Sequence, residues 1–94
     1  MEISIRDLLK IKSPNIIDIR SNQKYNDNHI PGSVNISNDI LLSNPNKFLD
    51  KGLLYYIYCQ RGITSKMTTQ ILRALGYNVI SVKDGYEAYI LNKI

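Results

Sequence analysis

The sequence has very few of the residues that build disulfides, metal sites and membrane spans. It contains one cysteine and one histidine in 94 residues, so an internal disulfide is impossible and a zinc site would lack its usual ligands. No apolar stretch approaches the roughly 20 residues that a membrane-spanning helix needs. The first residues carry no basic segment followed by an apolar one, which argues against an export signal. We therefore expect a cytoplasmic protein with no membrane partner and no bound metal.

Charge of either sign is spread along the chain and is never concentrated. Twelve Lys and Arg against eight Asp and Glu leave a net charge of +4, and no run of like charges or basic stripe interrupted by aromatic residues occurs. Such a distribution is typical of a solvated surface and predicts no nucleic-acid partner. With 44% hydrophobic and 21% charged residues, the composition is that of a soluble globular protein. The length allows one small domain, residues 1–94, and excludes a second.

One stretch, residues 53–76, organises the rest of the chain. Residues 53–58 are uncharged and rich in aromatic and aliphatic side chains, a pattern typical of a strand that is buried on both faces of a parallel sheet. Further along, apolar residues recur at helical spacing and predict an amphipathic helix that ends at Gly76. These apolar positions are Met67, Ile71, Ala74 and Leu75.

The loop between this strand and this helix combines a nucleophile with a cradle for an anion. Cys59 follows the strand and precedes the helix, where free backbone N–H groups and the helix dipole favour a thiolate. Gly62 allows a positive φ, so that successive N–H groups can converge on an anion. Arg61 and Lys66 add positive charge nearby. A reactive thiol explains this arrangement better than a buried cysteine that serves only packing.

The other segments alternate between short strands and short helices. The expected strands are residues 1–3 at an edge, 15–19, 33–36, 53–58 and 78–82. The expected helices are residues 4–12, 21–27, 38–42, 45–49, 64–75 and 86–92. This alternation predicts an α/β fold with a small, mainly parallel central sheet of four to five strands flanked by helices, and a site at the carboxyl ends of the strands.

Four segments resemble motifs of the rhodanese sulfurtransferases, in the same order along the chain. Residues 59–65, Cys-Gln-Arg-Gly-Ile-Thr-Ser, resemble the active-site loop of that family. Residues 18–20 resemble its Asp-x-Arg, and residues 29–35, His-Ile-Pro-Gly-Ser-Val-Asn, resemble its His-Ile-Pro-Gly-Ala-x-Asn signature. Residues 84–89 resemble its Gly-Gly-x-x-x-Trp segment. The likeness covers nearly the whole chain and implies a rhodanese-like three-layer fold.

The resemblance implies a role for each matching residue. Cys59 would be the catalytic residue that carries sulfur. The residues that would form the loop for substrate and anion binding are Gln60, Arg61, Gly62, Ile63, Thr64 and Ser65. The residues in a supporting role would be Asp18, Arg20 and His29.

Several of these roles have an alternative from the residue type itself. We expect Asp18 and Arg20 to form a structural ion pair rather than to touch substrate, and His29 to hold a turn rather than to act as a base. Arg61 either contacts substrate or attracts anions from the mouth of the site. The hydroxyls of Thr64 and Ser65 donate to sulfur or cap the helix, and one of them could do both.

The chain departs from the family pattern at three positions. Many single-domain members carry arginine where Thr64 stands, although the two-domain enzymes carry threonine there. Asp84 replaces a glycine and Tyr89 replaces the tryptophan of the closing segment. We expect the changes at Asp84 and Tyr89 to alter packing near the last helix and to leave the chemistry unchanged.

The function that the resemblance implies is a sulfurtransferase of the thiosulfate:cyanide type. Sulfane sulfur would pass from thiosulfate or a persulfide donor to Cys59 and then to cyanide, a thiol or a protein acceptor, without a cofactor. One alternative is a persulfide carrier or binding module that does not turn over. A phosphatase or arsenate reductase of the same fold is less favoured, because the related phosphatases carry their phosphate-holding arginine where Ser65 stands, and no arginine follows until Arg73.

Overall fold

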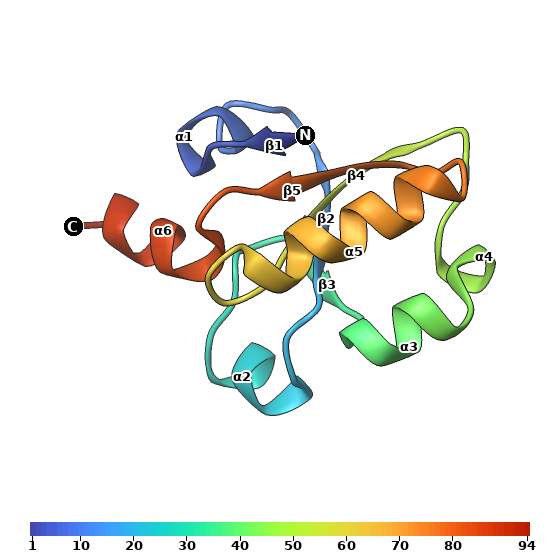
Figure 1. Ribbon diagram of the computed structural model, residues 1–94. Coiled ribbons are helices and arrows are strands. Elements are labelled where there is room, and N and C mark those ends of the chain that lie inside the picture. Colours follow the sequence, from blue (N-terminus) through green and yellow to red (C-terminus); the bar gives the residue numbers. More distant parts are fainter.

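A five-stranded sheet, in the order β1-β5-β4-β2-β3, forms the centre of the protein (Figure 1). The computed structural model describes all 94 residues. Every neighbouring pair of strands is parallel, so the predicted mainly parallel sheet is confirmed, with five strands. The strands are β1 (Glu2–Ile3), β2 (Asn15–Asp18), β3 (Ser33–Asn35), β4 (Leu54–Tyr58) and β5 (Asn78–Val82).

Helices cover both faces of the sheet and make the fold three-layered (Figure 1). They are α1 (Ile5–Leu8), α2 (Asn22–Asp27), α3 (Asn38–Ser43), α4 (Pro45–Phe48), α5 (Ile63–Ala74) and α6 (Gly85–Asn92). Alternate residues of a strand point to opposite faces, and the core is accordingly divided into two. Ile57 packs with Leu41 of α3 and Leu72 of α5, whereas Tyr58 packs with Leu8 of α1 and Tyr86 of α6.

The carboxyl ends of the central strands meet at one edge of the sheet. Asp18 of β2 lies in register with Tyr58 of β4 on one side and with Asn35 of β3 on the other. The next residue, Ile19, continues the ladder by donating its backbone N–H to the Tyr58 carbonyl at 3.0 Å. Whatever follows β2 and β4 in the chain is therefore brought together at this edge.

Helix α1 is shorter than the predicted span of residues 4–12. Ser4 caps it as its sequence suggests, because the side-chain oxygen accepts the Asp7 N–H at 3.1 Å. The helix then tightens after Leu8: the N–H groups of Lys10 and Ile11 bond to carbonyls three residues back instead of four. Such a tight last turn is common at helix ends.

Helix α5 packs on the sheet by a face other than the apolar one that its sequence presents. Met67, Ile71 and Leu75 are 62%, 48% and 52% exposed. The side that faces the sheet is formed instead by Ser65, Thr68, Thr69 and Leu72. Both buried threonines have hydrogen-bond partners: Thr68 donates to the Asn38 side chain of α3, and Thr69 donates to a carbonyl of its own helix. In this helix the apolar stripe of the sequence therefore does not mark the face that packs on the sheet.

None of the helices combines the length and apolar character that crossing a membrane requires.

Candidate active site

The sulfur of Cys59 lies at the start of α5 and accepts two backbone hydrogen bonds. The N–H of Gly62 is 3.2 Å and that of Ser65 is 3.3 Å from Sγ, and the Ser65 hydroxyl oxygen is 3.4 Å away. The first N–H groups of a helix have no partner within it. Sγ therefore occupies the position that an N-cap side chain usually takes, and an anionic sulfur would be stabilised there by both donors and by the helix dipole.

This geometry corrects the predicted helix start. Helix α5 begins at Ile63, and its N-cap is Gly62, which has no side-chain capping bond. Thr64 and Ser65 lie inside the first turn, so neither hydroxyl caps the helix. Ser65 instead turns its N–H and its hydroxyl toward sulfur, while Thr64 is exposed and borders the cleft.

The loop after Cys59 is held in shape by the start of α6. Gly62 adopts φ +85°, and a Cβ on it would come within 2.7 Å of the Asp84 nitrogen. In the other direction, the N–H groups of Tyr86 and Glu87 donate to the carbonyls of Cys59 and Gln60 at 2.9 and 3.1 Å. Two helix starts thus meet at the loop, and only glycine at residue 62 allows both the conformation and the contact.

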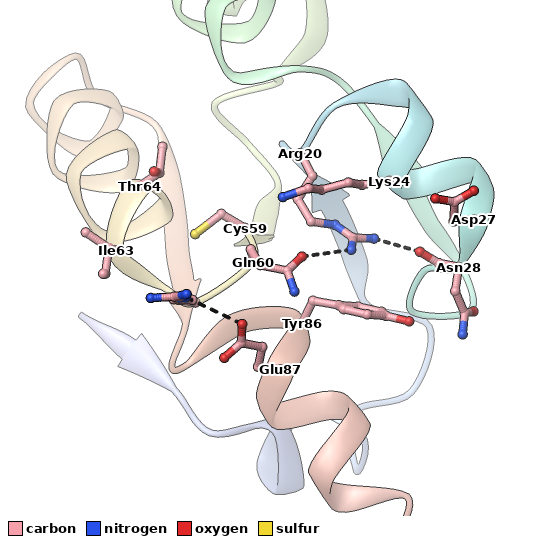
Figure 2. Close-up of a pocket in the computed structure, with 11 residues that line it drawn as sticks. Arg20, Lys24, Asp27, Asn28, Cys59, Gln60, Ile63, Thr64, Tyr86 and Glu87 are labelled. Atoms are coloured by element: carbon pink, nitrogen blue, oxygen red, sulfur yellow. Dashed lines mark hydrogen bonds and ion pairs between the residues drawn. The ribbon is translucent and has the colours of Figure 1, made fainter.

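Cys59 faces a cleft of about 630 Å³ (Figure 2). The cysteine itself is only 7% exposed, so only small groups can reach its sulfur from the cleft. The cleft is formed by the loop, the end of β2, helix α2 and the start of α6. Its lining residues are Arg20, Lys24, Asp27, Asn28, Cys59, Gln60, Arg61, Ile63, Thr64, Tyr86 and Glu87.

Asp18 and Arg20 form a buried ion pair at the end of β2. Arg20 Nη2 lies 2.8 Å from Asp18 Oδ2, and Arg20 Nε lies 3.0 Å from the same oxygen. Burial alone would lower the pKa of Arg20, but its hydrogen bond to Asp18 and the attraction of that carboxylate outweigh burial and leave the pKa above its ordinary value. The guanidinium therefore stays charged at the side of the cleft. The predicted ion pair is present, and its Arg20 member also borders the cleft.

The same guanidinium ties three parts of the site together. Arg20 Nη1 donates to Gln60 Oε1 at 3.2 Å, and Nη2 donates to the Asn28 carbonyl at 2.7 Å. Its guanidinium carbon Cζ lies 4.0 Å from the centre of the Tyr86 ring, within the range of a cation–π contact. Figure 2 shows Arg20 between Gln60, Asn28 and Tyr86. Gln60 thus anchors the loop through Arg20.

The expected basic residues are divided between the cleft and its surroundings. Arg61 borders the cleft at its mouth, 72% exposed, and its Nε lies 3.5 Å from a Glu87 carboxylate oxygen. Lys66 borders a separate groove and does not line the cleft. Lys24, which sequence analysis did not select, lies on the cleft wall instead.

His29 lies outside the cleft, in the turn before β3. Its Nδ1 is 2.8 Å from the Tyr25 carbonyl, and its ring stacks on Tyr25 with centroids 3.8 Å apart. The same turn is bound to β4, since the Ile30 N–H donates to the Tyr58 hydroxyl at 3.1 Å. Burial raises the pKa of Tyr58 above its ordinary value, which keeps this phenol neutral. The structure therefore places His29 in the turn and away from the sulfur.

Sequence analysis missed Tyr86 and Asn28. Tyr86 directly follows the Asp84-Gly85 turn, so the resemblance at that segment was a usable signal. Asn28 contributes its backbone carbonyl, which no side-chain pattern reveals. No group of three or more His, Cys, Asp or Glu side chains is placed to hold a metal ion.

The structure is a parallel α/β domain in which a cysteine sulfur at the strand ends accepts the backbone N–H groups of a helix start. The chain belongs to the rhodanese-like domain family, whose model matches residues 4–92. Residue 65 is a serine, and the next arginine, Arg73, lies at the other end of α5 and donates to the Val79 carbonyl at 3.1 Å.

Three curated relatives carry sulfurtransferase names. The chain is 30% identical over 92 residues to the thiosulfate sulfurtransferase GlpE of Shewanella oneidensis, covering 93% of this chain and 89% of that protein. It is 27% identical to the adenylyltransferase and sulfurtransferase uba4 of Ogataea parapolymorpha over 88% of this chain, and 38% identical to the tRNA sulfurtransferase of Thermoplasma acidophilum over 65%. The chain spans only 22% and 12% of the length of these last two.

Solved structures show the same architecture. A rhodanese-related protein of Thermoplasma volcanium superposes with a TM-score of 0.87 at 27% identity, covering 97% of this chain and 91% of that one. A rhodanese-like domain protein of Staphylococcus aureus superposes with a TM-score of 0.79 at 29% identity, covering 95% and 91%. Together with the named relatives, these likenesses support a role within the sulfurtransferase family.

Proposed function

We propose that the protein is a cytoplasmic sulfurtransferase that moves sulfane sulfur through a persulfide on Cys59. The observation that carries this proposal is the position of the sulfur. It accepts hydrogen bonds from two backbone N–H groups at a helix start and faces a cleft lined by several cationic side chains. A sulfur so placed is stabilised as an anion and is accessible to a small donor. We propose thiosulfate or a small persulfide as that donor.

In the first half-reaction, the Cys59 thiolate attacks the outer sulfur of thiosulfate. The new S–S bond forms as the S–S bond of thiosulfate breaks, and sulfite leaves with the electron pair of the broken bond. The product is a Cys59 persulfide that keeps one negative charge. This is covalent catalysis in two steps, for which ping-pong kinetics are expected.

The loop also has backbone N–H groups that are available to bind the negative charge of the persulfide. The backbone N–H groups of Arg61, Ile63 and Thr64 have no partner within the chain. Those of Ile63 and Thr64 belong to the first turn of α5, where the dipole favours negative charge. Preorganised donors of this kind stabilise an anion without reorganising during the reaction. We assign them to the outer sulfur and to the sulfonate end of the donor.

In the second half-reaction, an acceptor nucleophile attacks the outer sulfur, and the Cys59 thiolate leaves. Cyanide gives thiocyanate, whereas a thiol gives a new persulfide. We propose a thiol, either small or on a protein, as the acceptor in the cell. No nucleic acid, membrane or cofactor enters this scheme.

A carrier that loads sulfur but does not turn over is a second candidate. The 7% exposure of Cys59 favours it, because a bulky acceptor has little direct access to the sulfur. Steady-state formation of thiocyanate from thiosulfate and cyanide distinguishes the enzyme from the carrier. An enzyme gives many turnovers per molecule, whereas a carrier stops after one equivalent.

Incubation with thiosulfate is expected to raise the intact mass of the protein by one sulfur atom. Cys59 is the only cysteine, so the addition is assigned without mapping. Later addition of cyanide is expected to return the mass to its starting value. A mass that stays unchanged under thiosulfate and under a small persulfide donor would contradict both the enzyme and the carrier.

Thr64→Arg is expected to lower the KM for thiosulfate. Thr64 is exposed at the cleft, and a cation there attracts a dianion with about 0.2–1 kcal/mol, which corresponds to a decrease of up to about fivefold. The effect should weaken as salt is added. Thr64→Gln, which adds length without charge, is the matched control. If both variants change KM equally, residue 64 does not act through charge on the donor.

A further inference from the structure

A buried hydroxyl pair connects the sulfur to the middle of the sheet. The Ser65 hydroxyl oxygen lies 3.4 Å from Cys59 Sγ and 2.8 Å from the hydroxyl oxygen of Ser81. Ser65 and Ser81 are both fully buried. Ser81 is on β5, directly before Val82 and two residues after Val79, and both valines are buried. The three groups form one chain: sulfur, Ser65 and Ser81.

Each hydroxyl in this chain has a single hydrogen, so the direction of the bonds depends on the charge of the sulfur. A protonated thiol donates to Ser65, which then donates to Ser81. A sulfur anion has no hydrogen, and the chain must reverse: Ser81 donates to Ser65, and Ser65 donates to sulfur. Only a group at residue 81 that both donates and accepts permits both directions.

We propose that Ser81 is a positioning residue for Cys59, which turns the Ser65 hydroxyl toward the sulfur whenever the sulfur is an anion. Ser81 does not reach the sulfur and acts only through Ser65. Its donation to Ser65 polarises the Ser65 hydroxyl and makes it a stronger donor, because hydrogen bonds in a chain strengthen one another at low dielectric. The thiolate and the persulfide anion are both stabilised. The consequence for sulfur transfer rests on the proposed function, whereas the effect on the thiol does not.

A purely structural account of the pair makes a different prediction. Two buried hydroxyls can satisfy each other, and no buried polar side-chain atom is left without a partner in the protein. In that case the loss of Ser81 lowers stability, as the loss of any buried hydrogen bond does, but leaves the ionisation of Cys59 unchanged. The experiment must therefore measure the ionisation of the Cys59 thiol and not only the stability of the protein.

The experiment compares Ser81→Ala, Ser65→Ala and the double variant by the pH dependence of iodoacetamide alkylation. Ser81→Ala is expected to move the midpoint to higher pH by roughly half a unit to one unit, because the thiolate loses part of its stabilisation. In the Ser65→Ala background, the further change at residue 81 is expected to have no effect, since the two residues act in series. Ser81→Thr, which keeps the hydroxyl, is expected to restore the midpoint.

Ser33→Ala is the control for the loss of a buried serine. Ser33 is also buried and bonds to the Ile30 carbonyl at 2.7 Å, but it has no contact with sulfur. It is expected to lower stability and leave the alkylation midpoint unchanged. The titratable and charged groups that face the same cleft stay the same in every variant: Arg20, Lys24, Asp27, Arg61, Tyr86 and Glu87.

Two results would overturn the role of Ser81. One is an unchanged midpoint in Ser81→Ala with the fold retained by circular dichroism. The other is an equal shift from Ser81→Ala with and without Ser65. Neither depends on sulfur transfer, so a wild-type protein that fails to form a persulfide would refute the proposed function and leave this inference standing.

Discussion

Cys59→Ser is expected to abolish sulfur transfer and to leave the fold in place. Serine keeps the size and the hydrogen-bonding position of the side chain, so the bonds from Gly62 and Ser65 can persist. Its oxygen is neither ionised near neutral pH nor able to form a persulfide. We expect thiocyanate formation to fall to background, a loss of at least about a thousandfold, as for the removal of other covalent nucleophiles.

Alkylation of the wild-type protein tests the role of Cys59 independently of the substitution. Because Cys59 is the only cysteine, alkylation with iodoacetamide blocks one known atom and is expected to remove activity in proportion to the extent of labelling. The urea midpoint of Cys59→Ser should stay close to that of the wild type. Thiocyanate production above background by the purified variant, or full activity of the alkylated protein, would disprove the role of the thiol.

The strand–loop–helix unit around Cys59 could be predicted because its signals are local. The uncharged run before the cysteine, Gly62 in the loop and Gly76 after the helix all act on the backbone within a few residues. The structure gives Gly62 φ +85° and Gly76 φ +97°, both in the region that favours glycine. The alternation of strands and helices then limits the topology to parallel crossovers.

The orientation of α5 could not be predicted from the pattern of its own residues. The apolar positions, such as Met67 and Ile71, indicate one buried face, yet Thr68 and Thr69 face the sheet. The reason lies outside the helix. Ser65 must turn its N–H to Cys59, and residues three, four and seven positions further along lie on the same face. Contact with the sulfur thus sets the helix rotation against the hydrophobic pattern.

The contacts that assemble the cleft could not be predicted from the sequence either. Arg20 reaches Gln60, forty positions away, and this pairing follows from the adjacency of β2 and β4. The motif at residues 18–20 indicated an ion pair, which is local. It did not indicate that the same guanidinium anchors the active-site loop and lies over Tyr86.

The backbone conformation of residues 84 and 85 explains the resemblance of this segment to the glycine pair of the family. Asp84 and Gly85 both have φ +59°, so each position of the family's glycine pair lies in the left-handed region. Asp tolerates this conformation better than most residues, which explains how the substitution at residue 84 is accommodated. Gly85 has no such alternative, because a Cβ there would collide with the Cys59 carbonyl oxygen and lie 2.9 Å from the Gln60 carbonyl oxygen.

Gly85→Ala is therefore expected to destabilise the protein and to disrupt the loop. The start of α6 would have to move away from the loop. It would lose the bonds from the Tyr86 and Glu87 N–H groups to the Cys59 and Gln60 carbonyls. With the strain of left-handed alanine added, we expect the free energy of unfolding to fall by about 3 to 5 kcal/mol, as measured by urea denaturation.

Gly32→Ala separates the strain of the backbone from the collision. Gly32 also has a positive φ, +85°, but a Cβ there meets nothing within 4 Å. Its replacement is expected to cost only the conformational penalty, about 1 to 2 kcal/mol, and to leave the rate of persulfide formation unchanged because residue 32 is not part of the cleft. If Gly85→Ala is no less stable than Gly32→Ala and forms the persulfide equally fast, the close contact between α6 and the loop does not hold the sulfur in place.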